Sequence, residues 1–553
     1  MYRIAFHMGW GVELPDNRNQ TYLKGAAILA SASIIVRIIS AIYKIPLFQI
    51  MDAEGRGIFY TTYNVFTLIL TISTAGVPAA LSRMISSANA SGNSKLAKRY
   101  FSVAMPSFII IGIVAMLVMF LFAENFASLM NNPPTAPGIR ILSPAVFFVC
   151  IIAVYRGYAQ GYENMIPTAI SQITEVVCKA IIGIIAAIWL VNLGYATHIV
   201  SAGAMTGVTI GLGISVPLLV WYKQKLDRTI VTSDAVGAEA PGSLTIFGRI
   251  MKVSLPITLS SAFISIMVLI DNFIVLGRLQ DALGYTVEQA NVQWGIYALS
   301  LTIYNFPLAI VVPISLSIIP AIAAAITRGK PGEAGTIMQS SLKLVTLIAM
   351  PASAGLMVLA APILMALYEY DLPLATNILI ILGAAAFFAC LQYVTAAILQ
   401  ANGHERVTLL TFPIGAAFKI AIAYFLSGNP NFGIIASPIG TLVCFIVISV
   451  LNICFILVRV KEKPKFRKAF IRPLLCTAVM AAAAYLAYEA LFWIGSNTIE
   501  TNRIAVIVFL ILSIIIAIIV YGASVILTRT VTTDDMKLVP KGAKLSKLLR
   551  IRD

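Results

Sequence analysis

The sequence predicts an all-α integral membrane protein with about fourteen transmembrane helices. Of the 553 residues, 59% are hydrophobic and 11% are charged, a composition outside the range of soluble domains. Apolar windows of about 20 residues, the length that crosses a bilayer, recur along nearly the whole chain. The windows lie at residues 24–50, 58–86, 100–123, 139–160, 165–192, 199–222, 249–277, 294–326, 338–364, 374–400, 407–427, 434–458, 473–494 and 503–528.

The basic residues predict the side of the membrane on which each loop lies. The formal net charge is +16, but Lys and Arg collect in alternate loops, which is the positive-inside pattern and does not indicate nucleic-acid binding. With the N-terminus inside, thirty of the 39 basic residues fall in cytoplasmic segments and four in external loops. The other five lie within the membrane: Arg37, Lys44, Arg83, Lys179 and Lys419. We expect a multi-pass protein of the plasma membrane with both termini in the cytoplasm.

The first apolar segment carries two of these charges. Arg37 and Lys44 are two helical turns apart, and Ser33 and Ser40 extend this spacing into a polar stripe on one face. At ~1.5 Å per residue, Arg37 lies roughly 20 Å deep, beyond easy snorkelling. It therefore marks a transport path or forms a structural ion pair, and both interpretations stay open. Pro46 predicts a kink or break near Lys44.

The segment at 165–192 has a similar stripe, formed by Thr168, Gln172, Glu175 and Lys179. Lys179 lies roughly 21 Å from the inner end of its helix. Glu175 precedes it by four residues, the favourable order for a local ion pair. Lys179 is thus a candidate substrate ligand or the partner of a self-satisfied structural pair.

An internal repeat predicts two parallel halves. Gln160 precedes Lys179 by nineteen residues, as Gln400 precedes Lys419. Each pair spans a short cytoplasmic turn that contains a glycine, Gly161 or Gly403 in turn, and ends at mid-depth of the next helix.

A second likeness has nearly the same offset. Gly57-Ile58-Phe59, which leads to a Val-Pro pair, resembles Gly295-Ile296-Tyr297, which leads to another. An even number of segments separates the copies, so the two six-helix lobes have parallel orientations.

The predicted domains follow from this repeat. They are a cytoplasmic N-terminal segment (1–22), an N-lobe (23–222), a cytoplasmic linker (223–248), a C-lobe (249–458), a basic loop with two further helices (459–528) and a basic cytoplasmic tail (529–553). Seven basic residues in 459–472 and seven in 529–553 predict contact with anionic lipids.

Motifs for enzymatic chemistry are missing from the sequence. It has no P-loop, no metal-spaced His or Cys cluster and no Ser/His/Asp set, and its only histidines are His7, His198 and His404. We therefore expect no enzyme, no metal site and no cofactor. The six cysteines fall within predicted segments and are interpreted as small buried apolar residues.

The charges within the membrane favour an anionic, amphiphilic substrate. Arg37 binds a phosphate bidentately while lysines act as point charges, so the basic set would hold a pyrophosphate. Arg83, near the cytoplasmic face, is an anchor or a substrate contact. Asp271, near the outer end of its segment, binds a cation, pairs with a cavity lysine or reaches the interface.

Two motifs carry a family resemblance. They are Arg156-Gly157-Tyr158-Ala159-Gln160-Gly161 leading to Pro167-Thr168-Ala169-Ile170-Ser171-Gln172-Ile173-Thr174-Glu175, and Leu399-Gln400 with Gly403 leading to Lys419. With the helix pattern they resemble the bacterial polysaccharide-export branch of the MATE-like MOP superfamily, over about residues 22–472. Within it, the chain is similar to the stage V sporulation protein B type and the MurJ-like lipid II flippases.

The resemblance implies a MATE-like fold and a flippase that carries an undecaprenyl-pyrophosphate-linked sugar from the inner to the outer leaflet by alternating access. Arg37 matches the first of two paired basic residues in the family's first helix, and Tyr43 or Lys44 corresponds approximately to the second. The MurJ arginine of the second helix falls near Leu70 and has no counterpart, since Arg83 lies several turns later. Lipid II as the specific substrate is therefore left open.

Two other function classes remain. A cation-coupled multidrug antiporter of the same superfamily should have a cavity dominated by acids, and a non-transporting scaffold would leave the deep basic residues unexplained. For a flippase, the coupling agent is Na⁺, H⁺ or the membrane potential, with Glu175 and Asp271 as the candidate ion sites. The expected partners are the lipid-linked sugar, anionic lipids and cell-wall or polysaccharide synthesis enzymes.

Overall fold

The computed structural model describes residues 17–74, 76–91, 93–228, 241–368, 373–498 and 503–530. Every regular element in these ranges is a helix, and no β-strand occurs in them. A helix pairs its interior backbone N–H and C=O groups by hydrogen bonds within one segment, which is required in a bilayer core that contains no water. The all-α prediction is confirmed. The predicted N-terminal segment, linker and tail lie partly or almost wholly outside these ranges, and all the domain boundaries stay predictions.

Thirteen stretches of the described chain are long and apolar enough to cross a membrane. They match all of the predicted segments except 249–277, which lies inside the 39-residue helix α11 (Ser243–Asp281). That helix is longer than the ~20 residues that a bilayer requires. The chain is a multi-pass membrane protein.

The described chain folds into two compact units. The N-unit comprises residues 17–299 and 422–437, and the C-unit comprises residues 300–421 and 438–530. The division falls inside three helices, α12 (Val287–Thr327), α16 (Glu405–Ser427) and α17 (Ala436–Arg459).

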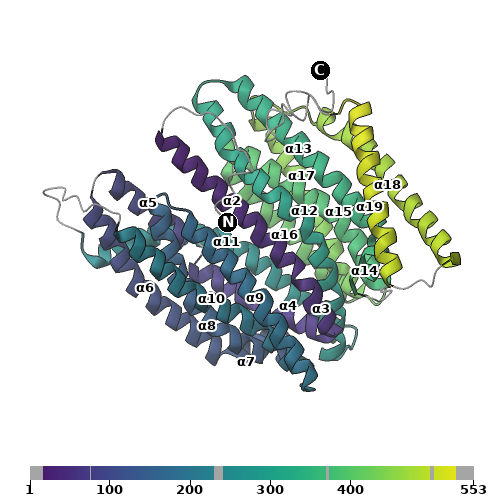
Figure 1. The fold of residues 1–553 in the computed structure, drawn as a ribbon, viewed down its shortest axis with the longest axis horizontal. Helices are drawn as coiled ribbons and strands as arrows, with labels where there is room; N and C mark the ends of the chain where they lie inside the picture. The colour runs from purple at the N-terminus through teal and green to yellow at the C-terminus, as the bar shows by residue number, and fades with distance from the viewer. Residues whose placement is uncertain are drawn as a thin grey trace. The chain divides into compact units, whose positions relative to one another are not determined.

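The N-unit is built around α8, which packs against α4, α5, α6 and α10 (Figure 1). Helix α9 packs on α10 and α2, and α11 packs on α4 and α5. The helices that precede α11 are α2 (Asn17–Ile42), α3 (Lys44–Ile50), α4 (Ala53–Thr74), α5 (Val77–Ala90), α6 (Ser94–Leu121), α7 (Ala123–Leu129), η1 (Pro133–Thr135), α8 (Ala136–Gly161), α9 (Ile166–Asn192) and α10 (Thr197–Asp227). Leu142, Val146 and Cys150 of α8 are fully buried, so this helix forms the core of the unit.

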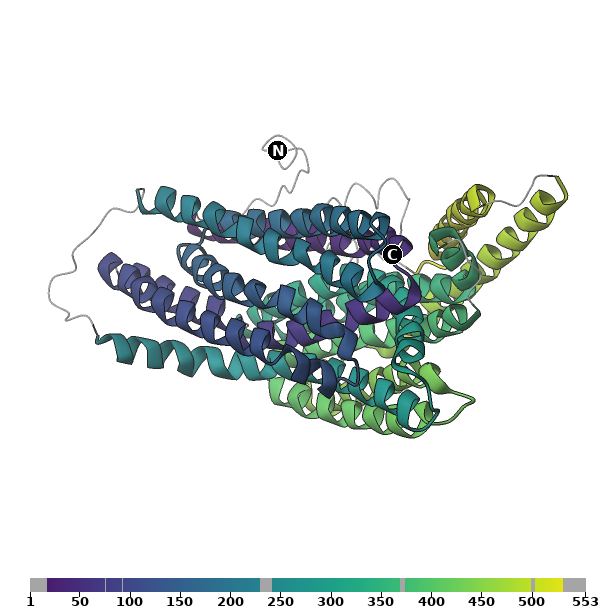
Figure 2. The same cartoon turned by 90° about the horizontal axis from the view of Figure 1, so that it is seen from below.

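The C-unit is organised around α13, which packs against α15 and α18. Beyond α12, the helices of the described chain are α13 (Pro331–Val358), α14 (Ala360–Tyr368), α15 (Pro373–Ala401), α16 (Glu405–Ser427), η2 (Gly433–Ile435), α17 (Ala436–Arg459), α18 (Phe466–Thr498) and α19 (Arg503–Leu527), with η2 belonging to the N-unit. The last two, α18 and α19, lie side by side at the yellow end of the colour scale (Figure 2). They have no counterpart in a six-plus-six repeat, and α19 also packs on α14.

The turns after α8 and α15 share one hydrogen-bond pattern. The N–H of Glu163 donates to the carbonyl oxygen of Gln160, and the N–H of Gly403 donates to that of Gln400, at 2.9 and 3.0 Å. The next residues, Asn164 and His404, donate to the carbonyl oxygens of Ala159 and Leu399, at 3.0 and 2.9 Å. Glu163 and Gly403, at equivalent positions, both have positive φ, 59° and 76°, as in a Schellman motif. The residue equivalent to Gly403 is therefore Glu163, as the equal spacing from each glutamine to its lysine requires.

The repeated glycines Gly57 and Gly295 meet where α4 crosses α12 in the N-unit. A Cβ on Gly295 would lie 1.7 Å from the carbonyl oxygen of Ala53, and a Cβ on Gly57 would lie 2.2 Å from that of Asn291. No side chain fits at either position, so glycine at both allows the two backbones to touch.

Candidate functional site

The first transmembrane segment breaks at Tyr43. Helix α2 ends at Ile42 and α3 begins at Lys44. Pro46, the third residue of α3, has no N–H to donate to the carbonyl oxygen of Ile42. The predicted break near Lys44 is confirmed.

The predicted polar stripe of this segment lies on α2. Arg37 is exposed, and Ser33 and Ser40 are half-buried. Arg37 makes no hydrogen bond or ion pair within the described part of the chain. Substrate binding by these three residues stays a prediction.

Two lysines of the N-unit are held by tyrosines. Lys44 Nζ donates to Tyr60 Oη at 3.2 Å and lies 4.7 Å from the centre of that ring. Lys179 is 8% exposed and its Nζ donates to Tyr63 Oη at 3.2 Å. The same Nζ lies 4.5 Å from the centre of the Tyr63 ring and 5.0 Å from that of Tyr43. All of these distances are within the ~6 Å at which an aromatic face attracts a cation.

The tyrosines hold these ammonium groups without neutralising them. Among the described residues, neither Lys44 nor Lys179 forms an ion pair. Two polar atoms, the hydroxyl of Tyr43 and Oε1 of Gln172, two helical turns before Lys179 on α9, are buried without a hydrogen-bond partner in the described chain. Buried polar atoms are almost always satisfied. A ligand that brings negative charge and hydroxyl groups would therefore suit this part of the N-unit. We call the cluster of Lys44, Lys179, Tyr43, Tyr60 and Tyr63 the lysine–tyrosine site.

Close packing of α9 on α10 sets the orientation of Lys179. A Cβ on Gly207 would lie 2.6 Å from the carbonyl oxygen of Lys179, and a Cβ on Gly211 would lie 2.9 Å from that of Glu175. Small residues four apart allow such close approach of membrane helices. The glycines of α10 thereby fix the rotation of α9 and the face on which Lys179 lies.

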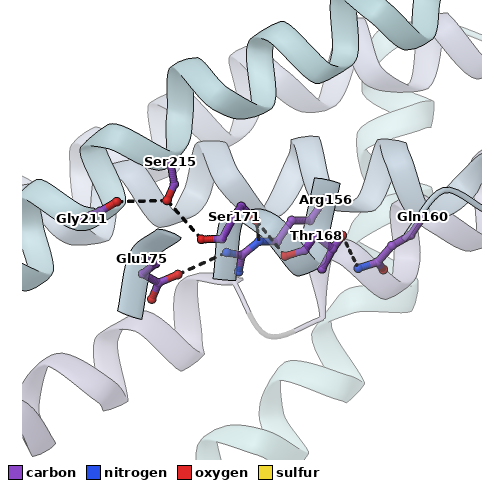
Figure 3. A network of polar contacts seen from close by, with 7 residues as sticks. All are labelled: Arg156, Gln160, Thr168, Ser171, Glu175, Gly211 and Ser215. Atoms are coloured by element: carbon purple, nitrogen blue, oxygen red, sulfur yellow. Dashed lines mark hydrogen bonds and ion pairs between the residues drawn. The ribbon is translucent and has the colours of Figure 1, made fainter. Parts of the chain in front are cut away.

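Arg156 of α8 joins three helices through a polar network (Figure 3). Its Nε donates to Ser171 Oγ at 2.9 Å, and its Nη2 lies 3.2 Å from Glu175 Oε2 in an ion pair. Ser215 of α10 donates to the carbonyl oxygens of Ser171, at 3.3 Å, and Gly211, at 3.0 Å. The network ties α9 to both α8 and α10.

The local pair between Glu175 and Lys179 does not form, because Arg156 takes the carboxylate and Tyr63 takes the ammonium group. The charge pattern predicts a cytoplasmic position for Arg156, and this role was not predicted. The turn at Glu163 reverses the chain between α8 and α9, and brings Arg156, seven residues before the turn, beside Ser171 and Glu175, eight and twelve residues after it. That reach across the hairpin is the signal that would have identified the pair.

Two further basic residues were predicted to bind substrate, Lys419 and Arg83. Lys419 is half-buried on α16 in the C-unit, where a Cβ on Gly440 would lie 3.3 Å from its Cγ. Arg83 is exposed on α5. The participation of Lys419 and Arg83 in substrate binding stays a prediction.

Asp271 of α11 is 5% exposed, and its Oδ2 accepts a hydrogen bond from Ser437 Oγ at 2.8 Å. The adjacent Asn272 is fully buried and donates to Thr61 Oγ1 at 3.0 Å. A buried carboxylate among hydroxyl and amide oxygens has the ligand chemistry of a hard cation. Its role in ion coupling stays a prediction.

The cysteines differ in part from expectation. All six are free, and Cys150, Cys390, Cys444 and Cys476 are buried. Cys178 is half-buried and Cys454 is exposed, because an apolar thiol is also compatible with a helix face that contacts lipid. Within the described ranges, no group of three or more His, Cys, Asp or Glu residues is placed to hold a metal ion.

Three proteins of Bacillus subtilis (strain 168) are similar to this chain. The uncharacterized membrane protein YabM is 25% identical over 532 residues, covering 96% of this chain and 97% of that protein. The lipid II flippase MurJ is 25% identical over 426 residues, covering 72% and 76%. Stage V sporulation protein B is 24% identical over 439 residues, covering 78% and 83%.

Solved structures have the same fold. The lipid II flippase MurJ in an inward closed conformation matches with a TM-score of 0.65 and 15% identity, over 90% of this chain and 99% of that one. An inward-facing multidrug resistance MATE family transporter of the MOP superfamily matches with a TM-score of 0.63 and 16% identity, over 79% and 98%. The chain therefore has the all-α MATE-like fold of the MOP superfamily, as its sequence predicted.

The family model for polysaccharide biosynthesis proteins matches residues 22–326. This range is more than half of the 553 residues and includes every residue of the lysine–tyrosine site. The chain belongs to the polysaccharide biosynthesis protein family.

Proposed function

We propose that this protein is a flippase that carries an undecaprenyl-pyrophosphate-linked oligosaccharide, lipid II or a surface-polysaccharide precursor, from the inner to the outer leaflet by alternating access. The observation that carries the proposal is the lysine–tyrosine site. Its two cations lie among tyrosines without a carboxylate partner, so their charge attracts an anion in a medium of low dielectric constant. Two similar proteins bear the names of a lipid II flippase and a sporulation protein, which supports this class of substrate.

The residues have distinct roles in this proposal. Lys44 and Lys179 attract the pyrophosphate, and the buried Tyr43 hydroxyl donates to one of its oxygens. Gln172 Oε1 accepts from a sugar hydroxyl. Arg37 and Lys419 add charge in one state of the transport cycle, and the lipid tail stays in or near the bilayer.

Leaflet-specific detection of undecaprenyl-linked sugars after depletion of the protein tests the proposal. The expected result is accumulation of one such sugar in the inner leaflet, and an unchanged distribution would refute it. Arg37→Ala should abolish complementation of a flippase-depleted strain at normal membrane levels, whereas full growth would remove Arg37 from the mechanism.

A cation-coupled multidrug antiporter is the second candidate, because a MATE transporter shares the fold. The surplus of cations over acids at the lysine–tyrosine site disfavours cationic drugs. Efflux of such drugs from cells that express the protein, without any effect on lipid-linked sugars, would favour this candidate.

Coupling, location and partners complete the proposal. The protein acts as a transporter and not as an enzyme, in the plasma membrane, with both termini in the cytoplasm. Asp271 is the proposed ion site because its buried carboxylate lies beside the Ser437 hydroxyl and is adjacent to the buried Asn272. Imposing a Na⁺ gradient, an H⁺ gradient or a membrane potential alone on proteoliposomes identifies which of them drives transport. Anionic lipids and cell-wall or polysaccharide synthesis enzymes are the proposed partners.

A further inference from the structure

Lys179 has a carboxylate within reach that it does not use. Glu175 lies four residues before it on α9, in the order that favours a helical ion pair. In the structure, Glu175 instead pairs with Arg156 at 3.2 Å, while Lys179 donates to Tyr63. The acid is therefore withheld from the lysine by a residue of another helix.

Two contacts fix the position of the Arg156 side chain. Its side chain is 16% exposed, and it binds both Ser171 and Glu175, toward which it points in Figure 3. Ser171 is itself anchored, since its Oγ donates to the carbonyl oxygen of Thr168 at 3.0 Å. A guanidinium group that donates in two directions is held more rigidly than a single ammonium contact would be.

The second half of the repeat has the same lysine without this pair. With the 240-residue offset that relates Glu163 to Gly403, the counterparts of Arg156, Glu175 and Lys179 are residues 396, 415 and 419. These are Ala396, Gly415 and Lys419. The acid and its arginine are absent together, and the lysine remains without a carboxylate four residues before it. In the first half Arg156 pairs with the acid, and in the second half Gly415 stands where the acid would be.

We infer that Arg156 is a positioning residue that sequesters Glu175, so that the Lys179 ammonium group keeps its net charge for an anionic head group. This inference rests on the proposed function. Without Arg156, Glu175 would be a half-buried carboxylate without a partner, which is unfavourable in a low-dielectric site. It would then pair with Lys179 and remove the charge that attracts the substrate.

Binding of undecaprenyl pyrophosphate to the purified full-length protein in detergent tests the inference. Arg156→Met should weaken binding by about tenfold or more, as expected for one lost charge interaction of moderate strength. Glu175→Gln should tighten binding, because it adds a net positive charge beside Lys179. The double variant R156M/E175Q should return to within about threefold of the wild type, well inside the tenfold that corresponds to ~1.4 kcal/mol.

The double variant separates positioning from structural support. If Arg156 only anchors α8 to α9, removing both partners cannot restore binding, so a double variant as weak as R156M would overturn the inference. Wild-type binding by R156M would overturn it as well. Lys179→Met tests the proposed site: if it binds like the wild type, the site and the inference both fail, whereas weak binding by K179M without rescue in R156M/E175Q refutes the inference alone. Membrane levels and elution as a single species confirm that each variant folds.

Discussion

Replacing Gly295 by alanine should destabilise the protein. The new Cβ would lie 1.7 Å from the carbonyl oxygen of Ala53 and 2.8 Å from its carbonyl carbon. Both are backbone atoms, so no side-chain rotation relieves the clash, and α4 and α12 must separate. Overpacking typically costs about 1–3 kcal/mol and occasionally more, and a clash with backbone belongs at the upper end of that range.

The control is Gly355→Ala in α13, where an added Cβ meets nothing within 4 Å. Alanine there should be neutral or stabilise the helix by up to about 1 kcal/mol. Thermal unfolding of the purified protein in detergent, followed by the loss of monodisperse protein, measures both variants. We expect a lower midpoint for G295A and an equal or higher one for G355A.

Gly57→Ala adds a test of the same crossing, since its Cβ would lie 2.2 Å from the carbonyl oxygen of Asn291. Once the helices have separated in G295A, the second alanine should cost less than it does alone, because neighbouring sites are not additive. Equal midpoints for G295A, G355A and the wild type would refute the conclusion that the two backbones touch at this crossing.

Three further predictions concern the N-unit. Lys179→Met should abolish complementation of a flippase-depleted strain at normal membrane levels, and Tyr63→Phe should reduce it less because the ring still attracts the cation; growth equal to the wild type in both would contradict the proposed site. Asn132→Ala should lower the unfolding midpoint, because its buried amide exchanges hydrogen bonds of 2.6 and 2.9 Å with Asn291, and an unsatisfied buried amide costs about 1–3 kcal/mol. Adding Asn291→Ala should lower the midpoint little further, and fully additive losses would show that the pair is not coupled. Asp271→Asn should remove the dependence of transport on a Na⁺ or H⁺ gradient in proteoliposomes, and an unchanged dependence would exclude Asp271 as the ion site.

Features that depend on local chemistry were predictable from the sequence. Apolar length identified the helices, and Pro46 located the break before Lys44, because a missing N–H acts on the carbonyl four residues earlier. The equal spacing from each glutamine to its lysine identified the repeated hairpins. The left-handed conformation of Glu163 was not predicted, because the equivalent residue of the second turn, Gly403, is a glycine and Glu163 is not.

Contacts between helices were not predictable from spacing alone. The pattern placed Lys179 at mid-depth, but it could not choose among Tyr43, Tyr63 and Glu175 as partners. The choice depends on the rotation of α9, which Gly207 and Gly211 of the next helix fix through backbone contact. Such glycines are visible in the sequence as small residues four apart. The sequence does not show which helix packs against them.

The same limit explains why a charged pair in the membrane cannot be interpreted from one helix. On α9 alone, Glu175 and Lys179 form a neutral pair that fits a structural role. With Arg156 of α8 added, the acid is neutralised at one level and the lysine stays cationic a turn away. The difference is one net charge in a medium where charge interactions are strong. Whether the site attracts an anion therefore depends on Arg156, nineteen residues before the acid. Substituting Arg156 is more decisive than substituting either residue of the Glu175–Lys179 pair on α9.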